Sequence, residues 1–523
     1  MRQGVLSRAW VQSLIVVAVC AVLYWPLLGT PGFGMSEGHR VVPAWTMLET
    51  GRWLKMEMFG QTYLRKPPGF PWAIALASMV FGKTEFAARA VSAASCTVMA
   101  LTALWYSRRW FGDGRWRGPL GAGVAQAIMP QFVAIGRVAE IDALNALGTQ
   151  FACLALIDLA RPDGPRARLA PAGIAGAGIL IAGLAKGPAS ATCLLGVMIA
   201  LCVGTRSIRA LANVYTLGAI GSAAAAIGVI AWLVARANAG GGVTQDFSEF
   251  TWSFDRLGGT LRLIPAAFVA ALPASIALVP LLAERLTGVP IAGNGVRRER
   301  ELAHIIGFAW LLSVGLLMLM GISNSRYAMP AAVLLPPLVA YTLGLAAPVE
   351  SPEHAGASRV VREVSRWCVL RHPLVIPIVL VPLLLWWSVY RETYRDRREA
   401  GRRAGAALAA SLIRDGDVWA NDLVEARPDV LLYMQRASRG RVTPLWMPEA
   451  LRSGELPRLP VESGRRAYLL LRSDSQSAER DRYAKWIAPP GPSRPAEPQS
   501  PVRLHRLTSG RAASYEFELY EVE

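Results

Sequence analysis

Residues 211–235 read LANVYTLGAIGSAAAAIGVIAWLVA and contain no charged side chain. A run of about 20 apolar residues is long enough to cross the hydrocarbon core of a bilayer as a helix. Similar runs recur along the chain, at approximately residues 11–29, 87–106, 118–135, 141–160, 169–185, 188–204, 262–283, 303–321, 327–346 and 373–390. The sequence therefore predicts a polytopic α-helical membrane protein with about eleven transmembrane helices, the first of them an uncleaved anchor.

The composition of the whole chain agrees with a membrane location. Hydrophobic residues make up 53% and charged residues 18%, whereas soluble proteins have roughly 45–50% and about 25%. These values argue against a cytosolic enzyme and against a disordered or fibrous chain. The net charge of +18 would suggest nucleic acid in a soluble protein, but arginine-rich cytoplasmic loops explain it better, so no nucleic-acid partner is expected.

The arginines between the predicted spans indicate the orientation. They fall in every second connection, which the positive-inside rule places in the cytoplasm together with the N-terminus. Because the number of predicted spans is odd, the C-terminal region is expected outside. The clusters are Arg108, Arg109, Arg115 and Arg117; Arg161, Arg166 and Arg168; Arg206 and Arg209; Arg285, Arg297, Arg298 and Arg300; and Arg359, Arg362, Arg366 and Arg371.

Two domains are expected. Residues 1–390 form a membrane domain whose first outer loop covers about residues 30–86, and residues 391–523 form a small C-terminal α/β domain outside the membrane. Residues 69–82 are apolar but too short to span, so they predict a re-entrant or interfacial helix in the outer loop. The tail contains strand-like runs at Val418–Leu423, Ala467–Arg472 and Tyr515–Val522, a helix-like stretch at Arg427–Gln435, and a Pro- and Ser-rich loop at residues 489–502.

Several kinds of site are not expected. The six cysteines lie in or beside apolar runs with no Cys-x-x-Cys pair, so neither a disulfide framework nor a zinc site is predicted. No Walker loop is present, and no Gly-x-Gly-x-x-Gly follows a strand-like run. Nothing in the sequence therefore indicates a nucleotide-driven pump.

The first outer loop contains the residues with the clearest chemistry. Glu37 lies where the chain leaves the membrane, and a carboxylate there can act as a general base because partial burial makes it more basic. An amphipathic helix is expected over residues 42–50, with Gly51 as its C-cap. Lys66 follows in the turn Arg65-Lys66-Pro67-Pro68, although lysine accounts for only five of the 55 basic residues. Two prolines restrict this lysine, which suits it to bind a phosphate as a point charge.

These motifs, in this order, resemble the first periplasmic loop of the GT-C superfamily of polyprenyl-phosphate-dependent glycosyltransferases. The nearest families are the 4-amino-4-deoxyarabinose lipid A transferases and the bacterial protein O-mannosyltransferase-like proteins. The resemblance is good over roughly residues 10–345 and loose over the tail. The matching residues of the loop are Ser36-Glu37, Arg40, Met47-Leu48, Gly51, Trp53, Gly60, Tyr63, Lys66-Pro67-Pro68, Phe81-Gly82 and Glu85-Phe86-Ala87-Ala88-Arg89.

Three later turns extend the resemblance. Residues 138–142 (Val-Ala-Glu-Ile-Asp) resemble a Thr-Glu-x-x-Asp turn, residues 185–188 (Ala-Lys-Gly-Pro) a Thr-Lys-Gly-Pro turn, and residues 325–330 (Ser-Arg-Tyr-Ala-Met-Pro) an Arg-Tyr-x-x-Pro turn. All three fall on the outer face in the topology drawn from the arginines. One departure stands out: the family's acidic pair is usually Asp-Glu with the first acid catalytic, but here the first position is Ser36, which leaves Glu37 to act.

The resemblance implies the fold, the reaction and the roles of the residues. A sugar would move from a polyprenyl-phosphate carrier to a lipid (such as lipid A), glycan or protein acceptor at the periplasmic face of the bacterial inner membrane, with inversion by single displacement. No cofactor is required, although a divalent metal stays compatible with this chemistry. The implied catalytic residues are Glu37 and Asp142; the implied donor-phosphate residues are Lys66, Arg326 and Tyr327; and the further substrate contacts are Arg40, Glu140 and Lys186.

Each assignment has a simpler alternative. Glu37 could interact with the dipole of the following helix, and Lys66 could reach the lipid headgroups. Lys186 could bind the carbonyls at the end of a helix, while Arg326 and Tyr327 could be interfacial anchors. For the whole protein, a lipid or glycan transporter and a non-catalytic scaffold for envelope assembly are the competing functions. Few ionisable residues lie in the middle of the predicted spans, which argues against an ion-coupled transporter.

Overall fold

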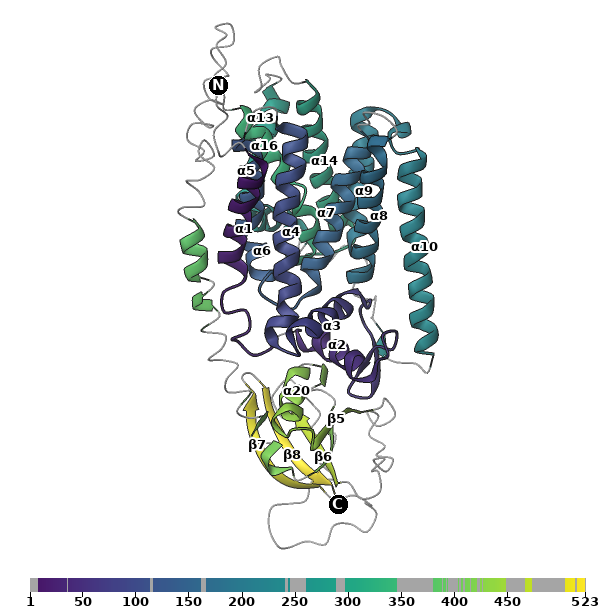
Figure 1. Ribbon diagram of the computed structural model, residues 1–523, viewed down its shortest axis with the longest axis vertical. Coiled ribbons are helices and arrows are strands. Elements are labelled where there is room, and N and C mark those ends of the chain that lie inside the picture. The colour runs from purple at the N-terminus through teal and green to yellow at the C-terminus, as the bar shows by residue number, and fades with distance from the viewer. Residues whose placement is uncertain are drawn as a thin grey trace.

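A computed structural model describes most of the chain. The described residues are 8–345, with gaps at 35, 113–115, 161–165, 240–242, 245–259 and 288–296, then segments within 380–447, and residues 466–472, 504–512 and 515–522. The loop predicted at residues 489–502 and the whole arginine cluster from Arg359 to Arg371 lie outside the described residues, as do residues 373–379 of the eleventh predicted run. A bundle of helices forms one end of the molecule and a small sheet the other (Figure 1).

Helices occupy all eleven predicted apolar runs within the described residues, the last of them over residues 380–387. Side-chain caps begin several of them: the hydroxyl of Thr84 accepts a hydrogen bond from the Ala87 N–H at 3.1 Å at the start of α4. The bundle helices are α1 (Ala9–Tyr24), α4 (Glu85–Phe111), α5 (Arg117–Ile128), α6 (Pro130–Ile135), α7 (Ile141–Leu159), α8 (Arg166–Lys186), α9 (Ala191–Thr205), α10 (Val214–Ala237), α12 (Leu263–Ala270), α13 (Leu278–Thr287), α14 (Arg297–Leu319), α15 (Met329–Ala332) and α16 (Pro336–Leu345).

Five of these helices are long and apolar enough to cross a membrane by themselves, namely α4, α7, α8, α10 and α14. A sixth span is possible if residues 263–270 and 274–286 cross as one segment, although they are bent by 109°. The other apolar runs are divided into shorter helices, as in α5 and α6, where Met129 adopts an extended conformation before Pro130. The fold is that of a multi-pass helical membrane protein, and the number of eleven spans stays a prediction.

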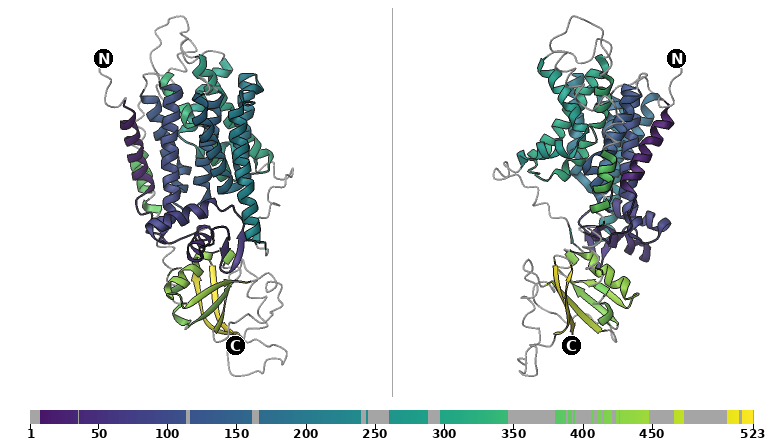
Figure 2. Two further views of the ribbon diagram at one scale, coloured as in Figure 1. Left: turned by 45° about the vertical axis from the view of Figure 1, so that its right-hand side comes forward. Right: turned by 90° about the vertical axis from the view of Figure 1, so that its left-hand side faces the viewer.

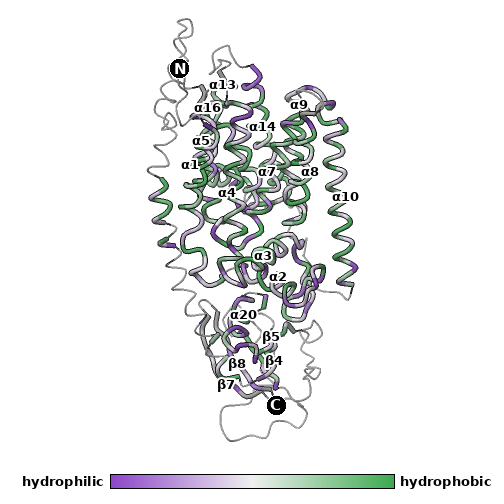
Figure 3. The backbone as a smooth tube through the Cα atoms, in the orientation of Figure 1, coloured by the Kyte–Doolittle hydropathy of each residue, from purple (hydrophilic) through white to green (hydrophobic). Residues whose placement is uncertain are grey.

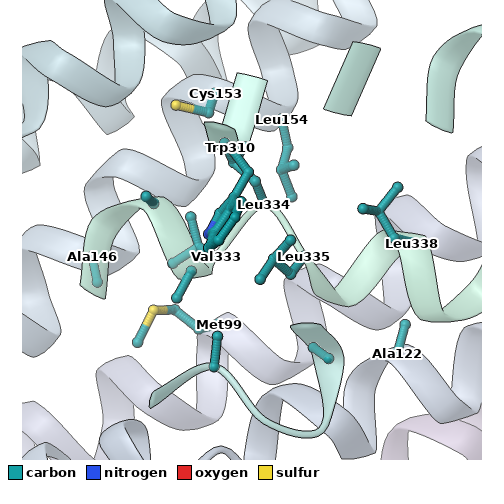
Figure 4. Close-up of a cluster of buried hydrophobic side chains, with 14 of the residues drawn as sticks. Met99, Ala122, Ala146, Cys153, Leu154, Trp310, Val333, Leu334, Leu335 and Leu338 are labelled. Atoms are coloured by element: carbon teal, nitrogen blue, oxygen red, sulfur yellow. The ribbon is translucent and has the colours of Figure 1, made fainter. Parts of the chain in front are cut away.

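The interior of the bundle is apolar and closely packed. Met99 of α4, Cys153 of α7 and Trp310 of α14 meet around residues 333–338, which form the connection from α15 and the start of α16 (Figure 4). Hydrophobic residues predominate along the bundle helices, and more hydrophilic residues lie near the ends of the helices (Figure 3). Large apolar side chains such as Trp105, Leu217 and Leu311 are exposed on these helices. Apolar side chains therefore cover both the core and the faces that would contact lipid.

The first outer loop folds into two helices across one end of the bundle. Helix α2 (Gly38–Thr50) ends at Gly51, whose φ of 69° forms the C-cap expected from the sequence. Helix α3 (Gly69–Phe81) has 13 residues and lies across the ends of the bundle helices rather than along them (Figure 1), as the prediction of an interfacial segment required. Between these helices, strands β1 (Glu57–Met58) and β2 (Gln61–Leu64) pair with each other, and β2 pairs with β3 (Val243–Thr244).

The C-terminal part contains a five-stranded sheet in the order β5-β4-β6-β8-β7. Its elements are β4 (Gly416–Ala420), α20 (Pro428–Ala437), β5 (Val442–Trp446), β6 (Arg466–Arg472), β7 (Leu504–Ala512) and β8 (Tyr515–Val522). Strands and a helix therefore form at all four tail segments for which they were predicted, while β5 and β7 were not predicted. Strands β5, β4 and β6 are parallel, and β8 is antiparallel to both β6 and β7.

Helix α20 connects the sheet to the outer loop. The Tyr433 hydroxyl accepts a hydrogen bond from the Phe33 N–H at 2.5 Å, and Arg436 binds Glu85 at 2.9 Å. A side chain at Gly38 would approach the Asp429 nitrogen to 2.9 Å, so α2 and α20 pack with little space between them. The sheet therefore lies at the same end of the bundle as α2 and α3, whereas α1 begins at the opposite end (Figures 1 and 2).

Candidate active site

Glu37 and Arg89 form a buried ion pair at the base of the outer loop. Both side chains are about 1% exposed, and the two Arg89 nitrogens lie 2.8 and 3.0 Å from the two carboxylate oxygens. The same carboxylate accepts hydrogen bonds from the N–H groups of Gly34 and Ala139, each at 2.8 Å. Glu37 is thus engaged on both oxygens, which gives it the surroundings of a structural carboxylate rather than those of a base that must accept a proton from a substrate.

Arg89 connects this pair to the chain that leaves α1. Its remaining guanidinium hydrogens bind the carbonyls of Leu28, Pro31 and Gly32 at 2.7–2.9 Å. One side chain of α4 therefore holds the start of the outer loop in place. Glu37 in turn binds the backbone N–H of Ala139, which lies just before α7.

Two carboxylates and two cations meet beside this pair. Glu140 and Asp142 lie at the start of α7, Lys186 ends α8, and Arg326 comes from the 3₁₀ turn η7 (Ser325–Ala328). Arg326 binds Glu140 at 2.7 Å and also contacts Asp142, while the Lys186 ammonium lies 2.5 Å from the other Asp142 oxygen. Glu140, Asp142, Lys186 and Arg326 are called the charge cluster below.

Two further residues complete the surroundings of the charge cluster. The Lys186 ammonium lies 4.0 Å from the centre of the Tyr327 ring, over its face. The Ser36 hydroxyl donates a hydrogen bond to the Glu140 carboxylate. Ser36, the residue that departs from the resemblance, is therefore in direct contact with an acid supplied by a different segment.

The formal charges of the charge cluster cancel, but the two acids are not equivalent. Both Asp142 oxygens face cations, whereas Glu140 faces one cation and one neutral hydroxyl. A carboxylate with two cationic neighbours is held strongly in its ionised form, which makes it a poor proton acceptor. Asp142 is thus placed to orient both Lys186 and Arg326, whereas one Glu140 oxygen faces only the neutral Ser36 hydroxyl.

Lys66 lies next to the end of α8 that carries Lys186. The turn between β2 and α3 packs so closely there that a side chain at Gly69 would meet the Leu184 carbonyl at 2.7 Å. Pro67 of this turn also faces Gly187, the residue after Lys186. The structure therefore places the two lysines on adjoining turns at the end of the bundle that carries α2 and α3.

Arg40 lies on α2, toward the C-terminal part. It is 8% exposed, and its Nε atom has no hydrogen-bond partner within the described segments. Its neighbour His39 is similarly buried, with its ring 5.9 Å from that of Tyr63. Burial, and then the positive charges of Arg40 and Arg65, lower the pKa of His39 from 6.5 to about 3.

This shift predicts a pH dependence of stability. Because the pKa of His39 is lower in the folded protein than its ordinary value, the neutral ring stabilises the fold above about pH 6.5, and this contribution is lost as the pH falls toward 3. We expect thermal unfolding in detergent to show a steeper loss of stability between pH 6.5 and 4 for the wild type than for His39→Gln, which lacks the titrating group. Equal slopes for the two proteins would contradict the prediction.

The structure thus brings together five residues that the sequence singled out: Glu140, Asp142, Lys186, Arg326 and Tyr327. Three residues beside them were not predicted as site residues from the sequence, namely Arg89, Asn145 and Ser190. The hydroxyl of Ser190, in the 3₁₀ turn η2 (Gly187–Ser190), donates to the Asn145 side chain at 2.5 Å. A charged or amide side chain inside an apolar run was the available signal for Arg89 and Asn145. No group of three or more His, Cys, Asp or Glu side chains that could hold a metal ion occurs in the described part of the chain.

Comparison with known proteins identifies one family model and one crystal structure that are similar to this chain. Residues 65–232 match the family model of dolichyl-phosphate-mannose-protein mannosyltransferase. Over nearly its whole length the chain resembles the crystal structure of ArnT from Cupriavidus metallidurans in the apo state, with a TM-score of 0.67, 17% identity, and coverage of 98% of this chain and 97% of ArnT. This chain has the fold of that ArnT structure. The resemblance inferred from the sequence motifs is thereby confirmed.

A second ArnT structure matches over the same length, and two curated relatives match over shorter segments. The same ArnT bound to undecaprenyl phosphate gives a TM-score of 0.64 at 18% identity, with 98% of both chains covered. Undecaprenyl phosphate-alpha-4-amino-4-deoxy-L-arabinose arabinosyl transferase of Aeromonas salmonicida is 28% identical over 165 residues, which are 31% of this chain and 28% of that protein. The second such transferase of Sodalis glossinidius is 33% identical over 101 residues, or 19% and 18%. The aligned segments thus span less than a third of these two relatives.

Proposed function

We propose that this protein is an inner-membrane glycosyltransferase that moves a sugar from a polyprenyl-phosphate carrier to an acceptor at the periplasmic face. The observation that carries the proposal is the charge cluster, which gathers two acids and two phosphate-binding cations at the outer end of a GT-C fold. Relatives whose names specify an undecaprenyl-phosphate-linked sugar, and an ArnT structure that holds undecaprenyl phosphate, support the choice of donor. Lipids, glycans and proteins with a free hydroxyl or phosphate oxygen are the acceptors that this chemistry admits.

In the proposed reaction the acceptor oxygen attacks the anomeric carbon while the bond from that carbon to the carrier phosphate breaks. The leaving phosphate gains one negative charge in this step, so nearby cations stabilise the transition state more than the bound donor. Lys66, Lys186 and Arg326 would supply that charge, and Tyr327 would hold Lys186 in place. A single displacement of this kind inverts the anomeric centre.

The acids would have separate roles. Glu140 would accept the proton of the attacking acceptor, with its carboxylate oriented by Ser36. Asp142 would keep Lys186 and Arg326 in position until the donor phosphate replaces part of its pairing. We assign Glu37 to holding the outer loop through Arg89, in place of the catalytic role expected from the sequence, because both of its oxygens are engaged. Arg40 stays a candidate contact for the anionic part of a substrate.

Lipid binding tests the proposal. We expect polyprenyl phosphate, with or without a sugar, to copurify with the detergent-extracted wild type and to be detected by mass spectrometry. Lys66→Ala should reduce the bound lipid roughly ten- to a hundred-fold, because one charge-assisted contact to the phosphate is lost. The mass of the bound lipid would also identify the donor sugar.

Lys83→Ala is the matched control. Lys83 lies in the same outer loop, but it is exposed and pairs with Glu49 at 2.6 Å, so its removal should leave lipid binding unchanged. If the wild type binds no polyprenyl phosphate even after the lipid is added, the glycosyltransferase proposal fails, and a transporter or a scaffold becomes the better explanation.

A further inference from the structure

Asn145 is a buried amide one helical turn below Asp142. The side chain is 0% exposed, and its oxygen accepts a hydrogen bond from the Ser190 hydroxyl at 2.5 Å. Its Nδ2 atom has no hydrogen-bond partner among the residues that the structure describes. A fully buried amide with one end engaged and the other unused, near the start of a buried helix, requires an explanation.

The position of Asn145 connects it to the charge cluster. Asp142 and Asn145 are three residues apart on α7, so they lie on the same face of that helix. Their partners Lys186 and Ser190 are four residues apart, at the end of α8 and in η2. Two polar contacts thus join the same segments one above the other: Asp142 with Lys186, and Asn145 with Ser190.

The surrounding backbone holds this arrangement rigidly. Helices α7 and α8 approach so closely at Gly148 that a side chain there would come within 2.5 Å of the Ala182 nitrogen. Gly178 on α8 is equally close to the Ala152 nitrogen, at 2.4 Å from its ideal Cβ position. The Asn145 amide therefore cannot be relocated by a small shift of either helix, and the Ser190 hydrogen bond sets which way it faces.

A buried N–H group without a hydrogen-bond partner is energetically unfavourable. Burying such a donor costs the whole free energy of removing it from water. Alanine or leucine at the same position has no polar side-chain group and so carries no such cost. An asparagine at position 145 is explained if a bound ligand accepts a hydrogen bond from its Nδ2–H group. A neutral amide matches a neutral hydroxyl, while the charged oxygens of a phosphate are matched by the neighbouring Lys186 and Arg326.

We propose that the Asn145 side-chain amide donates a hydrogen bond to a hydroxyl of the donor sugar, and that Ser190 fixes the direction of that amide. This inference rests on the proposed function. It adds a residue that contacts the sugar and not the carrier phosphate, so Asn145 would contribute to the choice of sugar.

Binding of three lipids to the purified protein tests the inference. The probes are undecaprenyl phosphate carrying 4-amino-4-deoxy-L-arabinose, undecaprenyl phosphate carrying mannose, and undecaprenyl phosphate alone. We expect the wild type to bind at least one sugar-bearing carrier more tightly than the carrier alone. Asn145→Ala should weaken binding of that probe by roughly three- to ten-fold, the effect of one hydrogen bond, with no change for the carrier alone.

Ser190→Ala is the matched control, because it removes the partner of the amide oxygen and keeps the amide itself. A smaller loss than that of Asn145→Ala, again confined to the sugar-bearing probe, is the expected result. Equal losses for all three lipids, or a fall in thermal stability that accounts for the loss, would show a structural role and overturn the inference. No loss for any lipid would overturn it as well and leave the proposed function standing, whereas failure of the wild type to bind the carrier would remove both.

Discussion

Replacement of Arg89 with leucine is expected to unfold the outer loop. The substitution would leave the buried Glu37 carboxylate without its cation and would remove the donor from three loop carbonyls. Breaking one partner of a buried ion pair costs about 3–5 kcal/mol, because the remaining charge is uncompensated. We expect a loss of this size in denaturant or thermal unfolding in detergent, together with proteolytic cleavage between α1 and α2.

Two further variants separate the charge from the packing. Arg108→Leu changes an exposed arginine at the other end of the same helix, which donates a 3.3 Å hydrogen bond to Gln12, and should cost about 1 kcal/mol or less. Replacing both Arg89 and Glu37 with leucine should be less damaging than Arg89→Leu alone, since no unpaired charge is then buried. If Arg89→Leu is as mild as Arg108→Leu, the ion pair does not hold the loop.

The general architecture could be predicted because it depends on local signals. A continuous apolar run such as residues 211–235 specifies a buried or lipid-facing helix without reference to the rest of the chain, and α10 occupies that run. The turns that carry Glu140, Lys186 and Arg326 were recognised from short motifs, each readable within about six residues. Their convergence followed from the arginine pattern, which placed all three turns on one face.

The partners of the acids could not be predicted, because they are distant in sequence. Glu37 and Arg89 are 52 residues apart, and Ser36 and Glu140 are 104 residues apart. Glu37 was assigned a catalytic role from its place at the membrane exit, but that place does not reveal how many donors surround the carboxylate. The number of donors is a property of the fold, and it is what distinguishes a structural acid from a proton acceptor.

The two strands missing from the prediction are both edges of the C-terminal sheet. Strand β5 contains Pro444, which is tolerated at an edge because a ladder hydrogen bond is not needed on both sides. Strand β7 is rich in polar residues and has a register shift between Arg506 and Thr508. Strand-like patterns identified β4, β6 and β8, which lie inside the sheet with a neighbouring strand on each side.

Glu140→Gln is expected to abolish most of the sugar transfer and leave the fold intact. The amide keeps the shape of the side chain and can still contact Ser36 and Arg326, so the free energy of unfolding should change little. It cannot accept the proton of the acceptor, and loss of a general base lowers the rate by about 10²–10⁴-fold. The measurement is single-turnover transfer from the donor lipid, with binding of the donor determined separately.

Glu37→Gln provides the contrast that decides between the two acids. That substitution weakens the pair with Arg89, so stability and transfer should fall together, and conditions that restore the fold should restore transfer. A Glu140→Gln protein that binds donor normally but turns over slowly would identify Glu140 as the proton acceptor. If Glu140→Gln keeps its transfer rate while Glu37→Gln loses transfer at unchanged stability, the base is Glu37, and the engaged carboxylate must then exchange Arg89 for the acceptor during the reaction.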